Sequence, residues 1–81
     1  MRLLVGIDVG GTFTDAVAYD RASGGLWTAK ARSTPADQSQ GFAEALSLVL
    51  GAAGGRPEQV ERIIHGTTVG TNAILERRGA R

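Results

Sequence analysis

The stretch IDVGGTFTD, residues 7–15, decides how this 81-residue chain folds. Apolar runs precede it at residues 3–5 and follow it at residues 16–19, so one strand enters the two-glycine turn and a second strand leaves it. Paired glycines between β-forming runs are typical of a hairpin, because such turns need positive φ values that glycine adopts without steric cost. We therefore predict strands over residues 3–9 and 13–20.

The next segments predict a third strand and an amphipathic helix. Residues 26–33 follow a glycine-rich turn and form a strand antiparallel to the second, whose two basic side chains indicate a solvated face. Asp37 is suited to cap a helix, with Gln40 in the position of a capping-box partner. One apolar stripe then recurs at four- and three-residue spacing: Phe42, Leu46, Val49, Leu50 and Ala53. The glycine pair at residues 54–55 ends this helix.

After the helix, the chain crosses over to a further strand. Pro57 opens a short helical turn, and residues 62–65 form a brief strand that a β-α-β connection lays parallel to the first. A final helix is predicted over residues 67–78, with Gly79 as its C-terminal cap. The order β-β-β-α-β-α is that of an α/β, ribonuclease-H-like half-domain with a mixed sheet and helices. Because a further strand would be expected next, we expect residues 1–81 to be one part of a larger domain.

The composition excludes several functions. A net charge of +1 gives no general attraction to nucleic acid or to a membrane surface. The absence of cysteine excludes disulfides and thiolate metal sites, which fits a cytoplasmic protein. No apolar run approaches the ~20 residues of a membrane span, and Asp8 interrupts the apolar core that a signal peptide needs.

The polar groups around the glycine turn are suited to binding a nucleotide phosphate. A tight turn at Gly10 and Gly11 exposes consecutive backbone N–H groups that can cradle anionic oxygens, and Thr12 and Thr14 add hydroxyl donors. Asp8, at the carboxyl end of its strand, would position a hydrated magnesium ion that bridges carboxylate and phosphate. The alternative is a plain hairpin in which the threonines cap the turn and the acids are solvated.

A second polar segment, His-Gly-Thr-Thr, begins at residue 65. Thr67 and Thr68 lie at or near a predicted helix N-terminus, whose free N–H groups suit an anion or a developing oxyanion. His65 is suited to donate to a phosphate or to act as an acid or base near neutral pH, and Asn72 lies about one turn further on. The alternative is structural: one threonine caps the helix, His65 ends the strand, and Asn72 bonds locally.

Both segments resemble a known family. VGIDVGGTFTD, residues 5–15, resembles the first phosphate motif of the superfamily that contains actin, heat-shock ATPases and sugar kinases. Residues 6–15 together with HGTTVGTNAILERRGA, residues 65–80, resemble the N-terminal region of the hydantoinase A/5-oxoprolinase family, to which acetone carboxylase subunits also belong. KARSTPADQSQGFAEAL, residues 30–46, is similar too, so the resemblance covers nearly the whole chain.

This resemblance implies roles for individual residues. Asp8 would organise magnesium-bound water. The glycines and threonines of the loop would contact the β- and γ-phosphates of ATP: Gly10, Gly11, Thr12 and Thr14. Asp15 matches the family motif and would orient the loop. The second segment would contribute catalytic residues, without a fixed role for each: His65, Thr67, Thr68 and Asn72.

The resemblance also implies an activity, which is the ATP-dependent opening of a cyclic amide such as hydantoin, N-methylhydantoin or 5-oxoproline. A B-type hydantoinase subunit would be the partner. The alternatives are an ATP-dependent carboxylase of the acetone carboxylase type, a sugar or acyl kinase, and a non-catalytic binding module. Because an actin-like ATPase closes two lobes over its nucleotide, we expect the 81-residue chain to fold but neither to hydrolyse ATP nor to open a ring.

Overall fold

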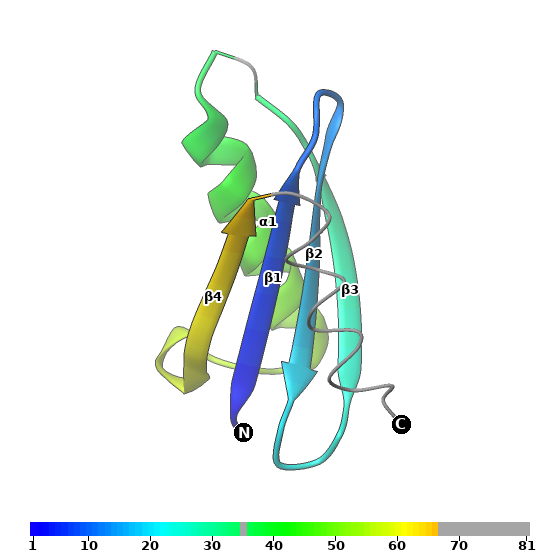
Figure 1. The fold of residues 1–81 in the computed structure, drawn as a ribbon, viewed down its shortest axis with the longest axis vertical. Helices are drawn as coiled ribbons and strands as arrows, with labels where there is room; N and C mark the ends of the chain where they lie inside the picture. Colours follow the sequence, from blue (N-terminus) through cyan, green and yellow to red (C-terminus); the bar gives the residue numbers. More distant parts are fainter. Residues whose placement is uncertain (35, 67–81) are drawn as a thin grey trace.

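The computed structural model describes residues 1–34 and 36–66 as a four-stranded sheet with a long helix on one face (Figure 1). The strand order is β3-β2-β1-β4, in which β1, β2 and β3 are antiparallel neighbours and β4 runs parallel to β1. The elements are β1 (Leu3–Val9), β2 (Phe13–Asp20), β3 (Leu26–Arg32), α1 (Gln38–Ala53), the 3-10 turn η1 (Pro57–Gln59) and β4 (Val60–Gly66). This mixed sheet confirms the predicted α/β fold, including the parallel pairing that the crossover required.

The first strand is central because side chains on both of its faces are buried. Leu3, Val5 and Ile7 are fully buried on the side of α1. Leu4 is buried on the opposite side, where it packs with Val17 of β2. A strand buried on both faces needs a nearly continuous apolar sequence, and the first residues of β1 supply it.

The core between the sheet and α1 is built from small residues on the sheet and larger ones on the helix. Ala16 and Ala18 of β2 and Ala31 of β3 are buried beneath the helix. These short side chains leave room for Val49 and Leu50 of α1 to approach the sheet. The predicted apolar stripe of the helix is therefore confirmed as its buried face.

Both predicted ends of the helix are confirmed. Asp37 is the N-cap, and its carboxylate accepts a hydrogen bond from the backbone N–H of Ser39 at 3.2 Å. The predicted capping box with Gln40 is not formed, because the Asp37 N–H donates to the Thr34 carbonyl at 2.9 Å and Gln40 contributes only its backbone N–H, which donates to the Asp37 carbonyl at 3.1 Å. Gly54 follows the last turn in the left-handed conformation, with a φ of 70° that explains the need for glycine there.

Three strand ends differ from the prediction. β3 ends at Arg32 instead of Ser33, because Ser33 turns its backbone N–H to the carbonyl of Thr12 in the β1–β2 loop at 2.9 Å. β4 begins at Val60, two residues earlier than predicted, because Val60 still pairs with Leu3 across a shift in the register. It also ends one residue later, at Gly66, which pairs with Asp8. None of these differences changes the topology.

The reason given for the glycine pair in the first turn was wrong. In the described part of the chain, the glycines with positive φ are Gly24 and Gly54, and neither belongs to this turn. Gly10 is required by a close approach instead, because a Cβ atom there would lie 2.9 Å from the carbonyl oxygen of Phe13. The Gly10 N–H donates to that same oxygen at 3.0 Å, which closes the loop.

Some predictions fall on residues that the structure does not describe. The final helix over residues 67–78 and its cap Gly79 lie outside the described residues. The same holds for Thr67, Thr68 and Asn72. Within residues 1–34 and 36–66, no helix is long and apolar enough to cross a membrane.

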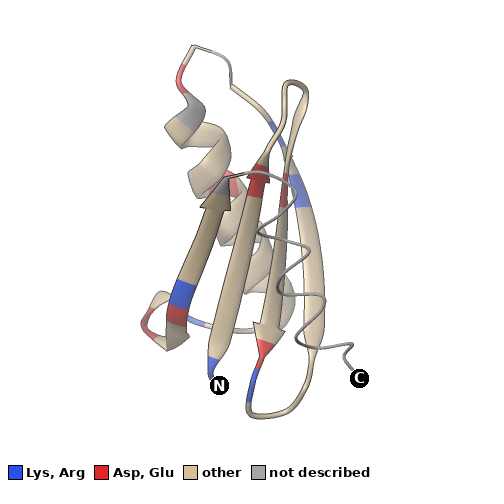
Figure 2. Cartoon of the chain, in the orientation of Figure 1, with Lys and Arg blue, Asp and Glu red and all other residues tan. Residues whose placement is uncertain are grey.

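Charged residues gather at the end of the sheet where β1 begins (Figure 2). Asp20, the last residue of β2, is 4% exposed, and its carboxylate accepts hydrogen bonds from the Arg2 N–H at 2.9 Å and the Ser23 hydroxyl at 2.7 Å. Glu61 of β4 pairs with the guanidinium groups of Arg2 at 3.0 Å and Arg21 at 3.2 Å. These contacts join the ends of three strands.

We expect acid to destabilise the fold through Asp20. The backbone N–H of Arg2 and then the Ser23 hydroxyl lower the pKa of Asp20 from 3.8 to about 2. Because the folded state has the lower pKa, the stability from this carboxylate is complete above pH 3.8 and is lost as the pH falls toward 2. Urea unfolding from about pH 6 to about pH 2 tests this, since the difference between wild type and Asp20→Asn should shrink within that window. A difference that stays constant across the range would contradict it.

Candidate functional site

The two polar segments of the sequence meet at the carboxyl ends of β1 and β4. The two strands are parallel, and their register pairs Ile7 with His65 and Asp8 with Gly66. The carboxyl ends of neighbouring parallel strands are where open α/β sheets place their ligands. The fold thus brings together segments that are more than fifty residues apart in the sequence.

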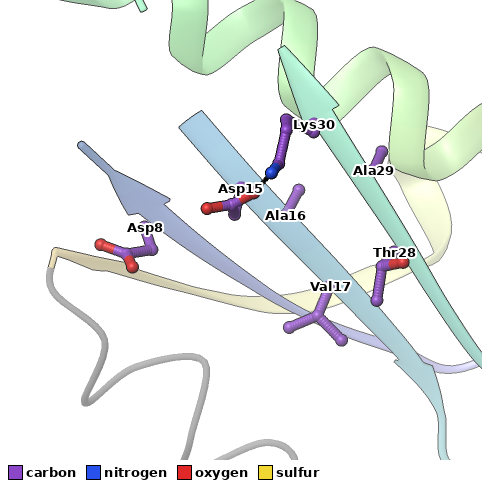
Figure 3. A pocket seen from close by; sticks show the side chains of 7 residues that line it. All are labelled: Asp8, Asp15, Ala16, Val17, Thr28, Ala29 and Lys30. Carbon is purple, nitrogen blue, oxygen red and sulfur yellow. Dashed lines mark ion pairs between the residues drawn. The ribbon is translucent and has the colours of Figure 1, made fainter. Parts of the chain in front are cut away.

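Two carboxylates lie next to each other on the sheet face opposite α1. Asp8 of β1 is half-buried and pairs in register with the exposed Asp15 of β2 (Figure 3). Lys30 of β3 places its Nζ 3.8 Å from Asp15 Oδ1 and 5.0 Å from the centre of the Phe13 ring. Like charges opposite each other on a sheet repel, so the Lys30 cation stabilises the pair.

An open pocket of about 480 Å³ surrounds these side chains. Its lining residues come from β1, β2 and β3: Asp8, Asp15, Ala16, Val17, Thr28, Ala29 and Lys30 (Figure 3). In the part of the chain that the structure describes, no three His, Cys, Asp or Glu side chains are grouped as metal ligands. A carboxylate such as that of Asp8 is suited to an ion that takes one or two carboxylates and completes its shell with water and phosphate oxygens, as magnesium does.

The loop between β1 and β2, residues 10–12, is here called the glycine loop. Ser33 holds two carbonyl groups of this loop. The Ser33 hydroxyl donates to the Gly10 carbonyl at 2.6 Å, and the Ser33 N–H donates to the Thr12 carbonyl. Among the described residues, no acceptor is bonded to the N–H groups of Gly11 and Thr12. A Cβ atom on Gly11 would meet no atom of residues 1–34 and 36–66 within 4 Å, so the described part of the chain leaves the space beside it open. Free N–H groups beside open space are suited to anionic oxygens.

Thr14 lies beneath the glycine loop. Its side chain is fully buried on the α1 side of the sheet, with Oγ1 3.0 Å from Ser33 Oγ. That side is opposite the face that carries Asp8 and Asp15, since successive strand residues alternate. The predicted phosphate contact of Thr14 stays a prediction, and its observed position favours a supporting role.

His65 lies on the other side of the sheet from Asp8. Its ring makes an edge-to-face contact with Phe42 of α1, with the centroids 4.9 Å apart and the planes at 82°. Together with Val9 and Ser39, these rings line a second pocket of about 360 Å³. The structure therefore brings Asp8 and Asp15 together and places His65 near the same strand ends but in a separate pocket.

The sequence interpretation missed two residues of the site. Lys30 was assigned to a solvated face, and it is exposed, but it also pairs with Asp15. Ser33 was assigned to the end of a strand and not to the loop. The β2–β3 register would have revealed both, because it pairs Asp15 with Lys30 and, extended by one residue beyond Phe13, places Ser33 opposite Thr12.

The two glycines of the loop should respond differently to alanine. Gly10→Ala is expected to lower the free energy of unfolding by about 1–3 kcal/mol, because the new methyl group meets the Phe13 carbonyl oxygen. Gly11→Ala is expected to change it by less than about 0.5 kcal/mol, because the space there is open. Urea unfolding of both variants tests the difference. Equal losses would contradict the packing described for Gly10.

The fold is of the actin-like ATPase type. Diol dehydratase-reactivating factor, in a structure of its nucleotide-free form, matches with a TM-score of 0.65 and 29% identity, covering 80% of this chain and 12% of that chain. Over residues 4–81 the sequence matches the hydantoinase/oxoprolinase N-terminal region. The chain belongs to this family, and the resemblance stated from its motifs is confirmed.

Two relatives illustrate the family. Caprolactamase subunit alpha of Pseudomonas jessenii is 37% identical over 95% of this chain. An uncharacterized protein of Methanocaldococcus jannaschii is 38% identical over 93% of it. The chain spans 12% and 10% of the lengths of these relatives.

Proposed function

We propose that this region supplies the first phosphate-binding loop of an ATP-dependent amidohydrolase that opens cyclic amides. The observation that carries the proposal is the glycine loop, which follows the strand of Asp8 and in which the Gly11 and Thr12 N–H groups have no acceptor among the described residues. The family supports the amidohydrolase class. The relative named as a caprolactamase subunit supports a cyclic amide as the substrate.

The residues present fit magnesium and ATP. Asp8 would hold the ion through water, and the phosphate oxygens would complete the shell, which agrees with the small number of carboxylates in the pocket. Asp15 is paired with Lys30 and would set the position of β2 next to the loop. When bound, Mg·ATP would supply the phosphoryl group that activates the amide carbonyl oxygen.

The chain's own groups would act by position and charge. The N–H groups of Gly11 and Thr12 would donate to the terminal phosphate oxygens and so stabilise the charge that moves during transfer. Because Ser33 already fixes the loop carbonyls, these donors need little rearrangement. The residues of the second polar segment would act on the amide substrate: His65 and, later in the sequence, Thr67, Thr68 and Asn72.

The rest of the enzyme is also part of the proposal. Because the chain spans about an eighth of the caprolactamase subunit, other segments would complete the nucleotide site and select the amide. The designation of that relative as a subunit alpha supports a B-type partner subunit for this protein. We place the reaction in the cytoplasm, where ATP is available. The absence of cysteine from residues 1–81 agrees with this compartment.

An assay of the full-length protein with Mg·ATP and a set of cyclic amides (caprolactam, hydantoin and 5-oxoproline) tests the proposal. The expected result is a ring-opened product with release of phosphate, dependent on ATP. A stable phosphorylated product would indicate a kinase, and a carboxylated product would indicate a carboxylase. Ring opening that is independent of ATP, or no nucleotide dependence at all, would contradict the proposal.

A further inference from the structure

Ser33 uses two of its groups to hold the glycine loop. Its hydroxyl donates to the Gly10 carbonyl at 2.6 Å, and its backbone N–H donates to the Thr12 carbonyl at 2.9 Å. Gly11 lies between these two fixed carbonyls. The Gly10–Gly11 and Thr12–Phe13 peptide planes are therefore oriented by Ser33, a residue 22 positions beyond Gly11 in the chain.

The direction of the hydroxyl hydrogen bonds can be assigned. A serine hydroxyl has one proton, and that of Ser33 is given to the Gly10 carbonyl. The 3.0 Å contact between Thr14 Oγ1 and Ser33 Oγ must then be a bond donated by Thr14. This gives a directed chain from the buried Thr14 hydroxyl through Ser33 to the loop, and such chains strengthen each of their bonds.

The backbone of Ser33 is itself held from the side of α1. Thr34, the next residue, accepts a hydrogen bond from the Gly41 N–H at 3.1 Å. A Cβ atom on Gly41 would lie 3.2 Å from the Arg32 carbonyl oxygen and 3.4 Å from Ser33 Cα, so the helix packs closely against this connection. Ser33 thus lies between the glycine loop on one side and α1 on the other, which allows it to hold the loop in one position.

We propose that Ser33 is the positioning residue of the phosphate-binding loop: it directs the Gly11 N–H group outward by holding the Gly10 carbonyl of the same peptide, and it keeps the Thr12 N–H group beside it by fixing the Thr12 carbonyl at the other end of the loop. The inference rests on the proposed function, because it is the bound phosphate that these N–H groups would meet. Ser33 itself touches no reacting atom. Ser33 keeps the loop ordered, and the ordered loop in turn raises the affinity for the nucleotide.

The test uses the full-length protein with three variants. Ser33→Ala removes the hydroxyl and keeps the backbone bond, and Ser33→Thr keeps both. Ser23→Ala is a matched control, because it also removes a hydroxyl that donates one hydrogen bond and accepts another, at the far end of the sheet. Hydrogen–deuterium exchange of the peptide covering residues 9–13, without nucleotide, reports the order of the loop through the Gly10 N–H, which donates to the Phe13 carbonyl. Titration calorimetry with Mg·ATP reports affinity.

Ser33→Ala should speed exchange in this peptide about tenfold and weaken Mg·ATP binding about tenfold. Ser33→Thr should restore both, and Ser23→Ala should change neither by more than about twofold. Unchanged loop exchange in Ser33→Ala would overturn the inference, whatever happens to affinity. So would faster exchange with unchanged affinity in a wild type that binds. A different outcome separates the two proposals: the exchange pattern is as expected, but the wild type has no affinity for Mg·ATP. This result would refute the proposed function. It would also overturn the role of Ser33 toward phosphate and leave Ser33 only as a support of the loop.

Discussion

Replacing Asp8 with asparagine in the full-length protein is expected to weaken Mg·ATP binding by about 100-fold or more. Asp8 is the half-buried carboxylate near the carboxyl end of β1, two residues before the first glycine of the glycine loop. An amide of the same shape keeps the packing but loses the charge that orders magnesium-bound water. Titration calorimetry of the purified variant measures the loss.

A control separates this effect from a general loss of negative charge. Glu58 is exposed in the turn η1, near the opposite end of the sheet, and Glu58→Gln removes the same charge there. Its affinity for Mg·ATP should stay within about twofold of wild type. An Asp8→Asn variant that binds as tightly as Glu58→Gln would contradict the assignment of Asp8.

The second large effect concerns stability, and two leucines on α1 provide a matched pair. Leu50 is 5% exposed and belongs to the core under the sheet, whereas Leu48 is 47% exposed. Leu50→Ala should lower the free energy of unfolding by about 2–5 kcal/mol, since it removes buried methyl groups and leaves a cavity. For a domain of this size such a loss is a large part of the total stability.

The same substitution at Leu48 should cost less than about 1 kcal/mol. Urea unfolding of the 81-residue chain, followed by the fluorescence of Trp27, its single tryptophan, compares the two variants. Trp27 is a suitable reporter because it packs against the core. Similar losses for Leu48 and Leu50 would contradict the assignment of the buried face of α1.

Much of the fold could be predicted because its signals are local. β1 and β2 follow directly from the apolar runs on either side of the first turn, and Asp37 and Gly54 mark the ends of α1. The start of β4 could not be predicted, because Val60 joins the strand only through its pairing with Leu3. A pairing between distant residues leaves no local pattern in the sequence.

The candidate site was predicted less completely, for a related reason. Asp8 and the glycine loop stand out because an acid and two glycines follow one another in the sequence. The roles of Lys30 and Ser33 depend on the β2–β3 register and were missed. The backbone angles of the loop also could not be derived from composition, since Gly10 is required by a close contact and not by a positive φ.

Titration of the full-length wild-type protein with ATP, in the presence and absence of magnesium, tests the central claim most directly. The claim is that the glycine loop and Asp8 together bind the terminal phosphates of a magnesium-bound nucleotide. We expect saturable heat of binding that depends on magnesium. No measurable heat of binding with magnesium present would contradict it.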